Sequence, residues 1–334
     1  MPSGPTTPMP KPATGLPRSI GIRNARENAV LAVLILCGLF TLFTTISIIV
    51  ILARTTVEFL AEPEVSLADF LFGLQWNPLL GSEKHFGIWP LIVGTLQITV
   101  VALAVAGPLG LVTAIWLSEY APRRVRAILK PVLEIIAGIP TVVLGFFALI
   151  AITPMLRLEF IRNADGSPWN PFGFAAYNSM SAGIAVGILT LPIIVSLGED
   201  ALRAVPRSLR EASYALGATR FETAIRVVLP AALSGIVAAF LLAIARCVGE
   251  TMIVALAAGS SPIPLHNAPA RAIDVRQETQ PMTGYLVQIF MGDASNFGIE
   301  YKSSYAVAAV LFVLTLLLTL TGELIRRRYR QAYE

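Results

Sequence analysis

Charged residues are scarce in this sequence, and so are the residue types that build common metal and catalytic sites. Asp, Glu, Lys and Arg make up 14% of the 334 residues, whereas about 25% is usual for a soluble domain. The two cysteines, Cys37 and Cys247, both lie within apolar runs, which excludes a disulfide framework and a four-ligand zinc site. The sequence also lacks the G-x-x-x-x-G-K-[ST] phosphate loop and the H-E-x-x-H motif. We therefore expect no metal, no cofactor, no catalytic residue and no ATP hydrolysis by this chain itself.

Long apolar runs fill most of the chain instead. They lie at residues 29–53, 89–117, 135–153, 174–197, 231–258 and 304–324. Each run is close to or longer than the ~20 residues that cross a bilayer as a helix. The first run is longer than the apolar part of a signal peptide, so we expect the chain to retain it. The sequence therefore predicts an all-α membrane protein with six transmembrane helices.

The charges between the runs alternate in sign along the chain. Lys and Arg gather at 123–130, 203–226 and 326–330, whereas acidic residues outnumber them in the segments 54–87, 154–173 and 259–303 taken together. Because cytoplasmic loops carry the excess of Lys and Arg, we expect a multi-pass membrane protein with both termini in the cytoplasm. These clusters account for the net charge of +4, so we expect contact with membrane lipid and none with nucleic acid. Residues 1–28, rich in Pro, Gly, Ser and Thr, predict a disordered cytoplasmic tail.

The junction at residues 198–230 is longer than a turn requires. Gly217 separates two helix-compatible stretches, 208–216 and 218–228, and glycine is favoured where a helix ends and the chain turns. Two short helices with a sharp bend are therefore predicted. Their arginines and small apolar residues fit either a docking element for another protein or an amphipathic helix on the anionic inner leaflet.

Two charged residues lie inside the fifth apolar run. Arg246 follows Pro230 by about 24 Å of helix at 1.5 Å per residue, which places Arg246 and Glu250 deep in the bilayer. Charges at that depth cost roughly 2.5–3.5 kcal/mol each when they face lipid, so both should face protein or water. Their i, i+4 spacing predicts that they share one helix face, where they either pair with each other or line a transport path. In such a path the guanidinium of Arg246 suits a tetrahedral oxyanion.

A family resemblance appears in the junction before this run, in Glu211, Ala212 and Ser213, then Gly217, then Val227, Leu229 and Pro230. Their order and spacing resemble the E-A-A...G...I-x-L-P loop of bacterial ABC importer permeases, with Ser213 in place of alanine and Val227 in place of isoleucine. The resemblance implies a protein of the bacterial inner membrane with a type I, MetI-like permease fold. In that fold, cytoplasmic coupling helices insert into a groove of an ATPase subunit. The resemblance assigns this coupling to Glu211, Ala212, Ser213, Gly217, Leu229 and Pro230. Pro230 is also expected to open the fifth span.

The fifth run itself resembles phosphate-importer permeases. Residues 246–252, R-C-V-G-E-T-M, are similar to R-A-x-G-E-T-M of that family, and residues 76–78, W-N-P, favour its PstC-type subunit over PstA. The resemblance implies that Arg246, Glu250 and Thr251 line the substrate pathway of a permease core at 88–328. It also implies four partners: a homologous PstA-type permease, two ATP-binding subunits and an external phosphate-binding protein.

The predicted function is thus the membrane permease of an ATP-driven importer of inorganic phosphate. We add the hypothesis that Glu250 accepts the P–OH proton of phosphate, which sulfate lacks. Two alternatives stay open: an ABC importer for another oxyanion (sulfate, molybdate or a phosphonate), and an ion-coupled secondary transporter gated by Arg246 and Glu250. Residues 54–87 and 259–303 are expected on the external side of the membrane. The second segment could either contact the binding protein or pack on its own subunit.

Overall fold

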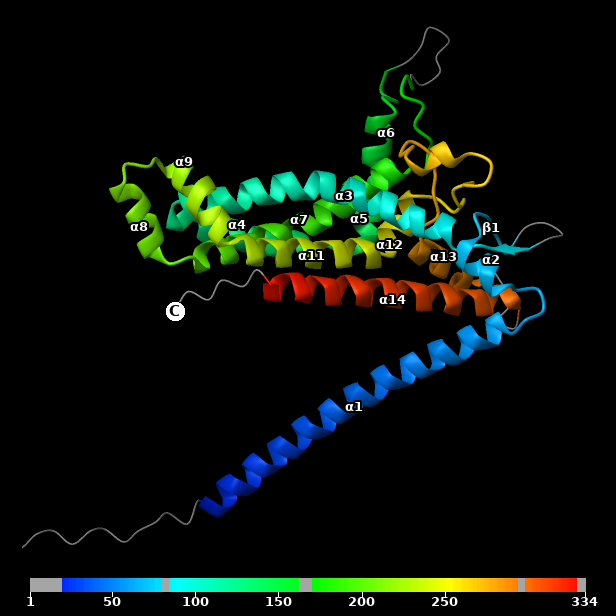
Figure 1. Cartoon of the computed structure of the whole chain (residues 1–334), viewed down its shortest axis with the longest axis horizontal. Coiled ribbons are helices and arrows are strands. Elements are labelled where there is room, and N and C mark those ends of the chain that lie inside the picture. Colours follow the sequence, from blue (N-terminus) through cyan, green and yellow to red (C-terminus); the bar gives the residue numbers. More distant parts are fainter. Residues whose placement is uncertain (1–19, 80–83, 162–169, 294–297, 329–334) are drawn as a thin grey trace, which may run out of the picture. The chain divides into compact units, whose positions relative to one another are not determined.

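The computed structural model describes residues 20–79, 84–161, 170–293 and 298–328, and the chain divides into two units after residue 51. The first unit contains most of α1 (Ile20–Leu60) (Figure 1). The side chains of residues 27–51 are almost all exposed. A helix that is apolar on every side suits lipid. Its candidate membrane span, Glu27–Leu60, is longer than the predicted 29–53. The helix begins at Ile20, inside the tail predicted as disordered, and residues 1–19 of that tail lie outside the described residues.

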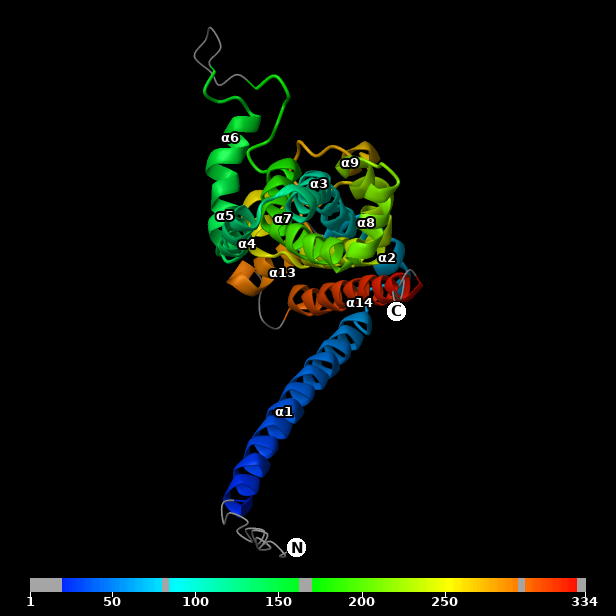
Figure 2. The same ribbon diagram turned by 90° about the vertical axis from the view of Figure 1, so that its left-hand side faces the viewer.

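The second unit is built around a bundle of long helices (Figure 1, Figure 2). Its members are α3 (Trp89–Ile115), α7 (Ser179–Ala204), α11 (Leu233–Gly249) and α14 (Ile299–Arg328). Helix α7 packs along α3 and α11, and α14 packs along α11. Small residues allow the closest of these approaches, because a Cβ at Gly183 of α7 would lie 2.5 Å from the Val101 side chain of α3.

Helix breakers have unequal effects in this bundle. Pro108 and Pro192 lie inside the continuous helices α3 and α7. By contrast, α4 (Arg123–Ala137) ends just before the Gly138-Ile139-Pro140 step, and the following segment, Thr141–Leu156, is bent away from it by 85° (Figure 1). That segment consists of α5 (Thr141–Phe147), η2 (Ala148–Ile152) and α6 (Thr153–Leu156).

A second bend, of 72°, separates the segment Arg220–Ala231 from α11. The described residues therefore contain 4 helices long and apolar enough to cross a membrane, or up to 6 if each bent pair is one span. The prediction of six spans corresponds to the upper number.

One end of the bundle carries the small sheet and is called the hairpin end. Its elements are α2 (Leu67–Phe72), the antiparallel strands β1 (Trp76–Asn77) and β2 (His85–Phe86), η4 (Pro269–Ala272), α13 (Met282–Gln288) and η5 (Ile289–Asp293). Trp76 packs edge-on against Phe86 and Tyr285, so an aromatic core joins the sheet to α13.

The opposite end is called the α8 end. Its elements are η1 (Trp116–Tyr120), which continues α3, the start of α4, and then α8 (Arg207–Ala215), α9 (Arg220–Thr223), η3 (Ala224–Val228) and α10 (Leu229–Ala231). Most of the arginines between the apolar runs lie at this end.

Candidate translocation and coupling sites

Helix α11 ends within the fifth apolar run, at Gly249. The backbone of Glu250 is extended (φ −67°, ψ 130°), and α12 (Met252–Ala257) begins at Met252. The prediction that Arg246 and Glu250 share one face of a continuous helix is therefore wrong. Glycine weakens the helix at this point, and the chain turns so that Glu250 is only 6% exposed whereas Arg246 is exposed. No ion pair joins their side chains in the part of the chain that the structure describes.

Two threonine hydroxyls stabilise this break. Thr283, in α13, donates to the carbonyl of Glu250 at 2.7 Å, and Thr251 donates to the carbonyl of Gly249 at 3.1 Å. Irregular backbone in an apolar layer is tolerated where its polar groups are satisfied inside protein or beside water. Thr283 is absent from the residues predicted for the site because it lies 33 positions from Glu250. Its sequence signal is weak, a hydroxyl residue in a short, mostly apolar stretch.

Helix α13 belongs to the long loop between the fifth and sixth runs, residues 259–303, and it packs on the rest of the chain. Met282 is fully buried, so this stretch packs on its own subunit. The stretch before it is open, with Ile273 84% exposed. There Arg276 pairs with Asp274 at 2.8 Å, and this guanidinium holds the pKa of the Asp274 carboxyl below its ordinary value.

One face of α11 is left uncovered by the other described residues of its unit. Leu242, Arg246 and Gly249 follow one another at helical spacing, and all three are exposed. A guanidinium inside an apolar span is costly against lipid. This face therefore needs a neighbouring subunit, an aqueous passage, or both.

The two short helices predicted around Gly217 are present at the α8 end. Helices α8 and α9 are joined by a turn in which Gly217 has φ +86°, a left-handed conformation that glycine adopts without strain. Thr219 caps α9 through a reciprocal hydrogen-bond pair with Glu222. This part of the junction could be predicted because the glycine and the cap are local signals.

Helix α8 has an outward and an inward face. Glu211, Ala212 and Tyr214 are exposed on the outward face, and Leu216, just after the helix, is 90% exposed. Ser213 lies on the inward face, although the family resemblance places it among the residues that contact the ATPase. Its hydroxyl hydrogen-bonds that of buried Thr223 at 2.9 Å, so the replacement of alanine by serine ties α8 to α9.

Two further residues predicted to take part in coupling follow η3 in the chain. Leu229 is half-buried, and Pro230 is exposed in the short α10. Pro230 does not open the long helix of the fifth span, because α11 begins at Leu233 after the 72° bend.

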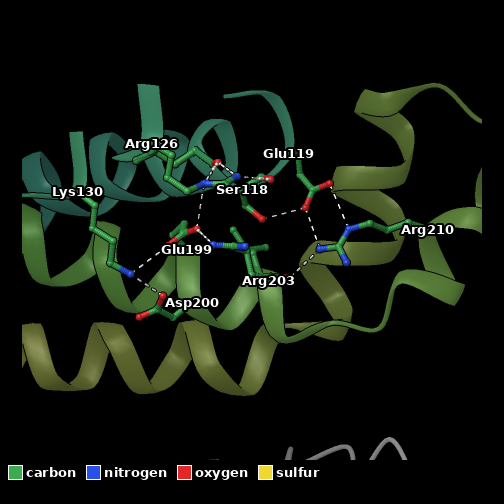
Figure 3. Close-up of polar contacts among 10 residues, drawn as sticks. Ser118, Glu119, Arg126, Lys130, Glu199, Asp200, Arg203 and Arg210 are labelled. Carbon is green, nitrogen blue, oxygen red and sulfur yellow. Dashed lines mark hydrogen bonds and ion pairs between the residues drawn. The ribbon is translucent and has the colours of Figure 1, made fainter. Parts of the chain in front are cut away.

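A cluster of charges lies behind α8, where the sequence indicated only a basic junction, and its members range from buried Glu199 to exposed Asp200. We call them the α8-end charge cluster, which consists of Glu119, Arg126, Lys130, Glu199, Asp200, Arg203 and Arg210 (Figure 3). Arg210 is one of the arginines of the junction that fit a docking element or a helix on the inner leaflet, but its side chain is 16% exposed and points inward. Arg207, Arg220 and Arg226 are exposed.

The chain has relatives among known transport proteins. The Bacillus subtilis protein named probable ABC transporter permease protein YqgH is 31% identical over 285 residues, 85% of this chain and 85% of that protein. The phosphate transport system permease protein PstC of Mesorhizobium japonicum is 30% identical over 258 residues, 72% of this chain and 77% of that protein.

A solved structure has the same fold. It is the crystal structure of a bacterial alginate ABC transporter in complex with an alginate pentasaccharide-bound periplasmic protein, in which one chain aligns with a TM-score of 0.61 and 14% identity. The alignment covers 93% of this chain and 98% of that one. The predicted fold of an ABC importer permease is therefore confirmed.

The family match covers the region that holds both candidate sites. Residues 106–331 match the family described as binding-protein-dependent transport system inner membrane component, and this range includes α7, α8, the break at Glu250 and α14. The chain is a multi-pass membrane protein that belongs to the family of binding-protein-dependent transport system inner membrane components.

Proposed function

We propose that this chain is a PstC-type permease subunit of an ATP-driven importer of inorganic phosphate. Family membership and the similarity to a phosphate permease support the proposal. The observation that carries it is the interrupted helix at Glu250, next to the exposed guanidinium of Arg246 inside an apolar span. A pathway for an anion accounts for both features, whereas a packed apolar core requires neither.

In this proposal Arg246 binds the transported anion. Arginine stays protonated and offers a planar fork of donors that matches two oxygens of an oxyanion. The uncovered face of α11 lies opposite the homologous PstA-type permease, and the pathway runs between the two subunits. Glu250 and Thr251 line it at the break. Near neutral pH, phosphate keeps a P–OH proton that the Glu250 carboxylate accepts, and sulfate has none.

The α8 end, in this proposal, lies in the cytoplasm with both termini. The exposed Arg207, Arg220 and Arg226 support this orientation, since cytoplasmic loops carry the excess of basic residues. One of two ATP-binding subunits docks on the outward face of α8, at Glu211 and Ala212, and on the Gly217 turn. The hairpin end then faces the external phosphate-binding protein. An ion-coupled transporter has less support, because the family depends on a binding protein.

The test is ATP-dependent uptake of radiolabelled phosphate by proteoliposomes that hold both permeases, the ATP-binding subunits and the binding protein. In Arg246→Ala we expect uptake to fall about tenfold or more, because a hydrogen bond to a charged group is worth about 1.5–3 kcal/mol and 1.4 kcal/mol is about tenfold. Arg124→Ala removes an exposed guanidinium from α4 and should leave uptake unchanged. Undiminished uptake in Arg246→Ala would remove Arg246 from the pathway.

Competition decides which oxyanion is the substrate. Unlabelled phosphate should suppress wild-type uptake, whereas sulfate and molybdate should not. In Glu250→Gln, sulfate should begin to compete, because the carboxylate that repels it is gone. Equal suppression of the wild type by sulfate or molybdate would favour an importer for another oxyanion. Unchanged phosphate uptake and unchanged sulfate exclusion in Glu250→Gln would contradict the role of this carboxylate.

A further inference from the structure

Arg210 joins α8 to the ends of two long helices (Figure 3). Its Nη2 and Nε lie 3.0 and 3.3 Å from the carboxylate oxygens of Glu119, in η1 at the end of α3. The same guanidinium donates to the carbonyls of Leu202 and Val205 at 2.8 and 2.7 Å, where α7 ends. A cation at a helix C-terminus satisfies carbonyls that the helix leaves free. Arg210 therefore closes α7 and holds the end of α3 at the same time.

Arg126, on α4, contacts the same two long helices, with the roles of carbonyl and carboxylate exchanged between them. Its guanidinium donates to the carbonyls of Leu117 and Ser118, where α3 continues as η1. Its Nε also lies 3.3 Å from a carboxylate oxygen of Glu199, on α7. Each arginine thus binds the final carbonyls of one long helix and the carboxylate of the other.

The two carboxylates are buried. The side chains of Glu119 and Glu199 are 8% and 2% exposed. Glu199 has two more cations nearby, Lys130 at 3.3 Å and Arg203 at 3.4 Å. Exposed ion pairs contribute little, but separating a buried pair leaves an uncompensated charge, so these contacts resist being pulled apart. They also lie behind the outward face of α8, where a docked subunit does not need to touch them.

The covalent link between α7 and α8 is short. Helix α7 ends at Ala204 and α8 begins at Arg207, with the cap residue Val205 and Pro206 between them. A tilt of α8 about this turn is opposed by the contacts between α8 and the long helices, which include the hydrogen bonds of Arg210 and the packing of the partly buried Leu209. With Arg210 bound to both long helices, α8 cannot tilt alone.

We infer that the pairs Glu119–Arg210 and Glu199–Arg126 form a clamp that makes α8, α3, α4 and α7 move as one body when an ATP-binding subunit displaces α8. The inference rests on the proposed function only for the identity of the subunit that displaces α8. Glu119 and Arg210 are positioning residues, because they act on the pathway through the helices they hold. The consequence is that loosening the clamp should uncouple ATP hydrolysis from transport rather than abolish either assembly or hydrolysis.

The test replaces one pair of the clamp by cysteines, Glu119→Cys with Arg210→Cys, in a Cys37→Ala background within the full transporter complex. Cys247 stays in place because it is buried. We expect the subunits to assemble and ATP hydrolysis to persist, while phosphate imported per ATP hydrolysed falls about fivefold or more, the lower end of typical couplings between sites. A short bis-maleimide that bridges the two cysteines should restore the ratio. The covalent bridge connects α8 to the end of α3, as the ion pair does in the wild type. A wild-type ratio before cross-linking, or no recovery in the cross-linked complex, would overturn the inference.

Two further variants keep the test decisive. Glu119→Gln preserves the shape of the side chain, so it should assemble even if the double-cysteine variant does not, and it should lower the same ratio. A wild-type ratio in Glu119→Gln would count against the clamp. Glu58→Gln is the matched control, because Glu58 forms an exposed ion pair with Arg54 at 3.0 Å and should leave the ratio unchanged.

A second measurement separates this inference from the proposed function. If the clamp exists, stimulation of ATP hydrolysis by the external binding protein depends on it. This stimulation can be measured without knowing which ion is transported. Loss of stimulation in Glu119→Gln supports the clamp even if the wild-type complex fails to import phosphate, which would contradict the proposed function alone. Full stimulation in Glu119→Gln would contradict the clamp whatever the substrate is.

Discussion

At the residue scale, the hydroxyl of Thr283 satisfies a carbonyl that the break in the fifth span leaves without a helical partner. The break separates Arg246 from Glu250, so its stability matters for any pathway built from these two side chains. The hydrogen bond comes from α13, which lies in a loop and not in the span itself. The geometry of the proposed pathway therefore depends on a residue outside the motif.

Thr283→Val should destabilise the permease. Valine has nearly the same shape as threonine but cannot donate to the Glu250 carbonyl, and an unpaired buried carbonyl costs about 1–3 kcal/mol. The midpoint of thermal unfolding of the purified protein in detergent measures the loss. Thr283→Ser keeps the hydroxyl and serves as the control. A Thr283→Val variant as stable as Thr283→Ser would show that this hydrogen bond contributes nothing.

At the element scale, the turn between α8 and α9 presents the surface proposed for the ATP-binding subunit. The positive φ of Gly217 sets the angle between the two helices. Apart from the neighbouring residues in the chain, no atom of the described residues lies within 4 Å of a Cβ built at this position, so a side chain there meets no obstacle. Any effect of a substitution must come from the backbone.

Gly217→Ala should weaken binding of the ATP-binding subunit by about 5–30-fold, because the left-handed conformation costs an L-residue roughly 1–2 kcal/mol. The affinity of the purified permease pair for the isolated ATP-binding subunit is the measurement. Gly38→Ala in α1 also meets open space, but in an ordinary helical conformation, and should bind like the wild type. Equal affinities for the two variants would show that the turn tolerates other backbone angles or lies away from the interface.

The prolines show where sequence reasoning about elements stops. Pro108, Pro192 and the Gly138-Ile139-Pro140 step all remove backbone hydrogen bonds, yet only the last of the three bends the chain sharply. The effect of each proline depends on the packing around it. Helices α3 and α7 pack along each other, and both continue as helices through their prolines. A sequence shows where a helix-breaking residue lies, but it does not show whether tertiary packing keeps the helix continuous there.

At the scale of the whole molecule, the hairpin end and the α8 end should lie on opposite sides of the membrane. Ser261 is exposed at the hairpin end and Ala204 is exposed at the α8 end. In a Cys37→Ala background, a membrane-impermeant maleimide should label Ser261→Cys in right-side-out vesicles and Ala204→Cys only in inside-out vesicles. Cys247 is buried and should stay unlabelled in both. The reverse pattern would place the arginine-rich end outside and contradict the proposed orientation.

The sequence by itself determined the membrane class, the family and the helical turn at Gly217. Hydropathy, charge between the apolar runs and short motifs are local properties, and lipid selects for them whatever the tertiary packing is. The tertiary structure alone decided that Arg246 and Glu250 part at a helix break, that Ser213 faces inward, and that Arg210 serves the clamp. These outcomes depend on partners far away in the chain, such as Glu119, 91 positions from Arg210. A buried charge or carbonyl takes the partner that folding brings within hydrogen-bond distance, and no local pattern specifies that partner.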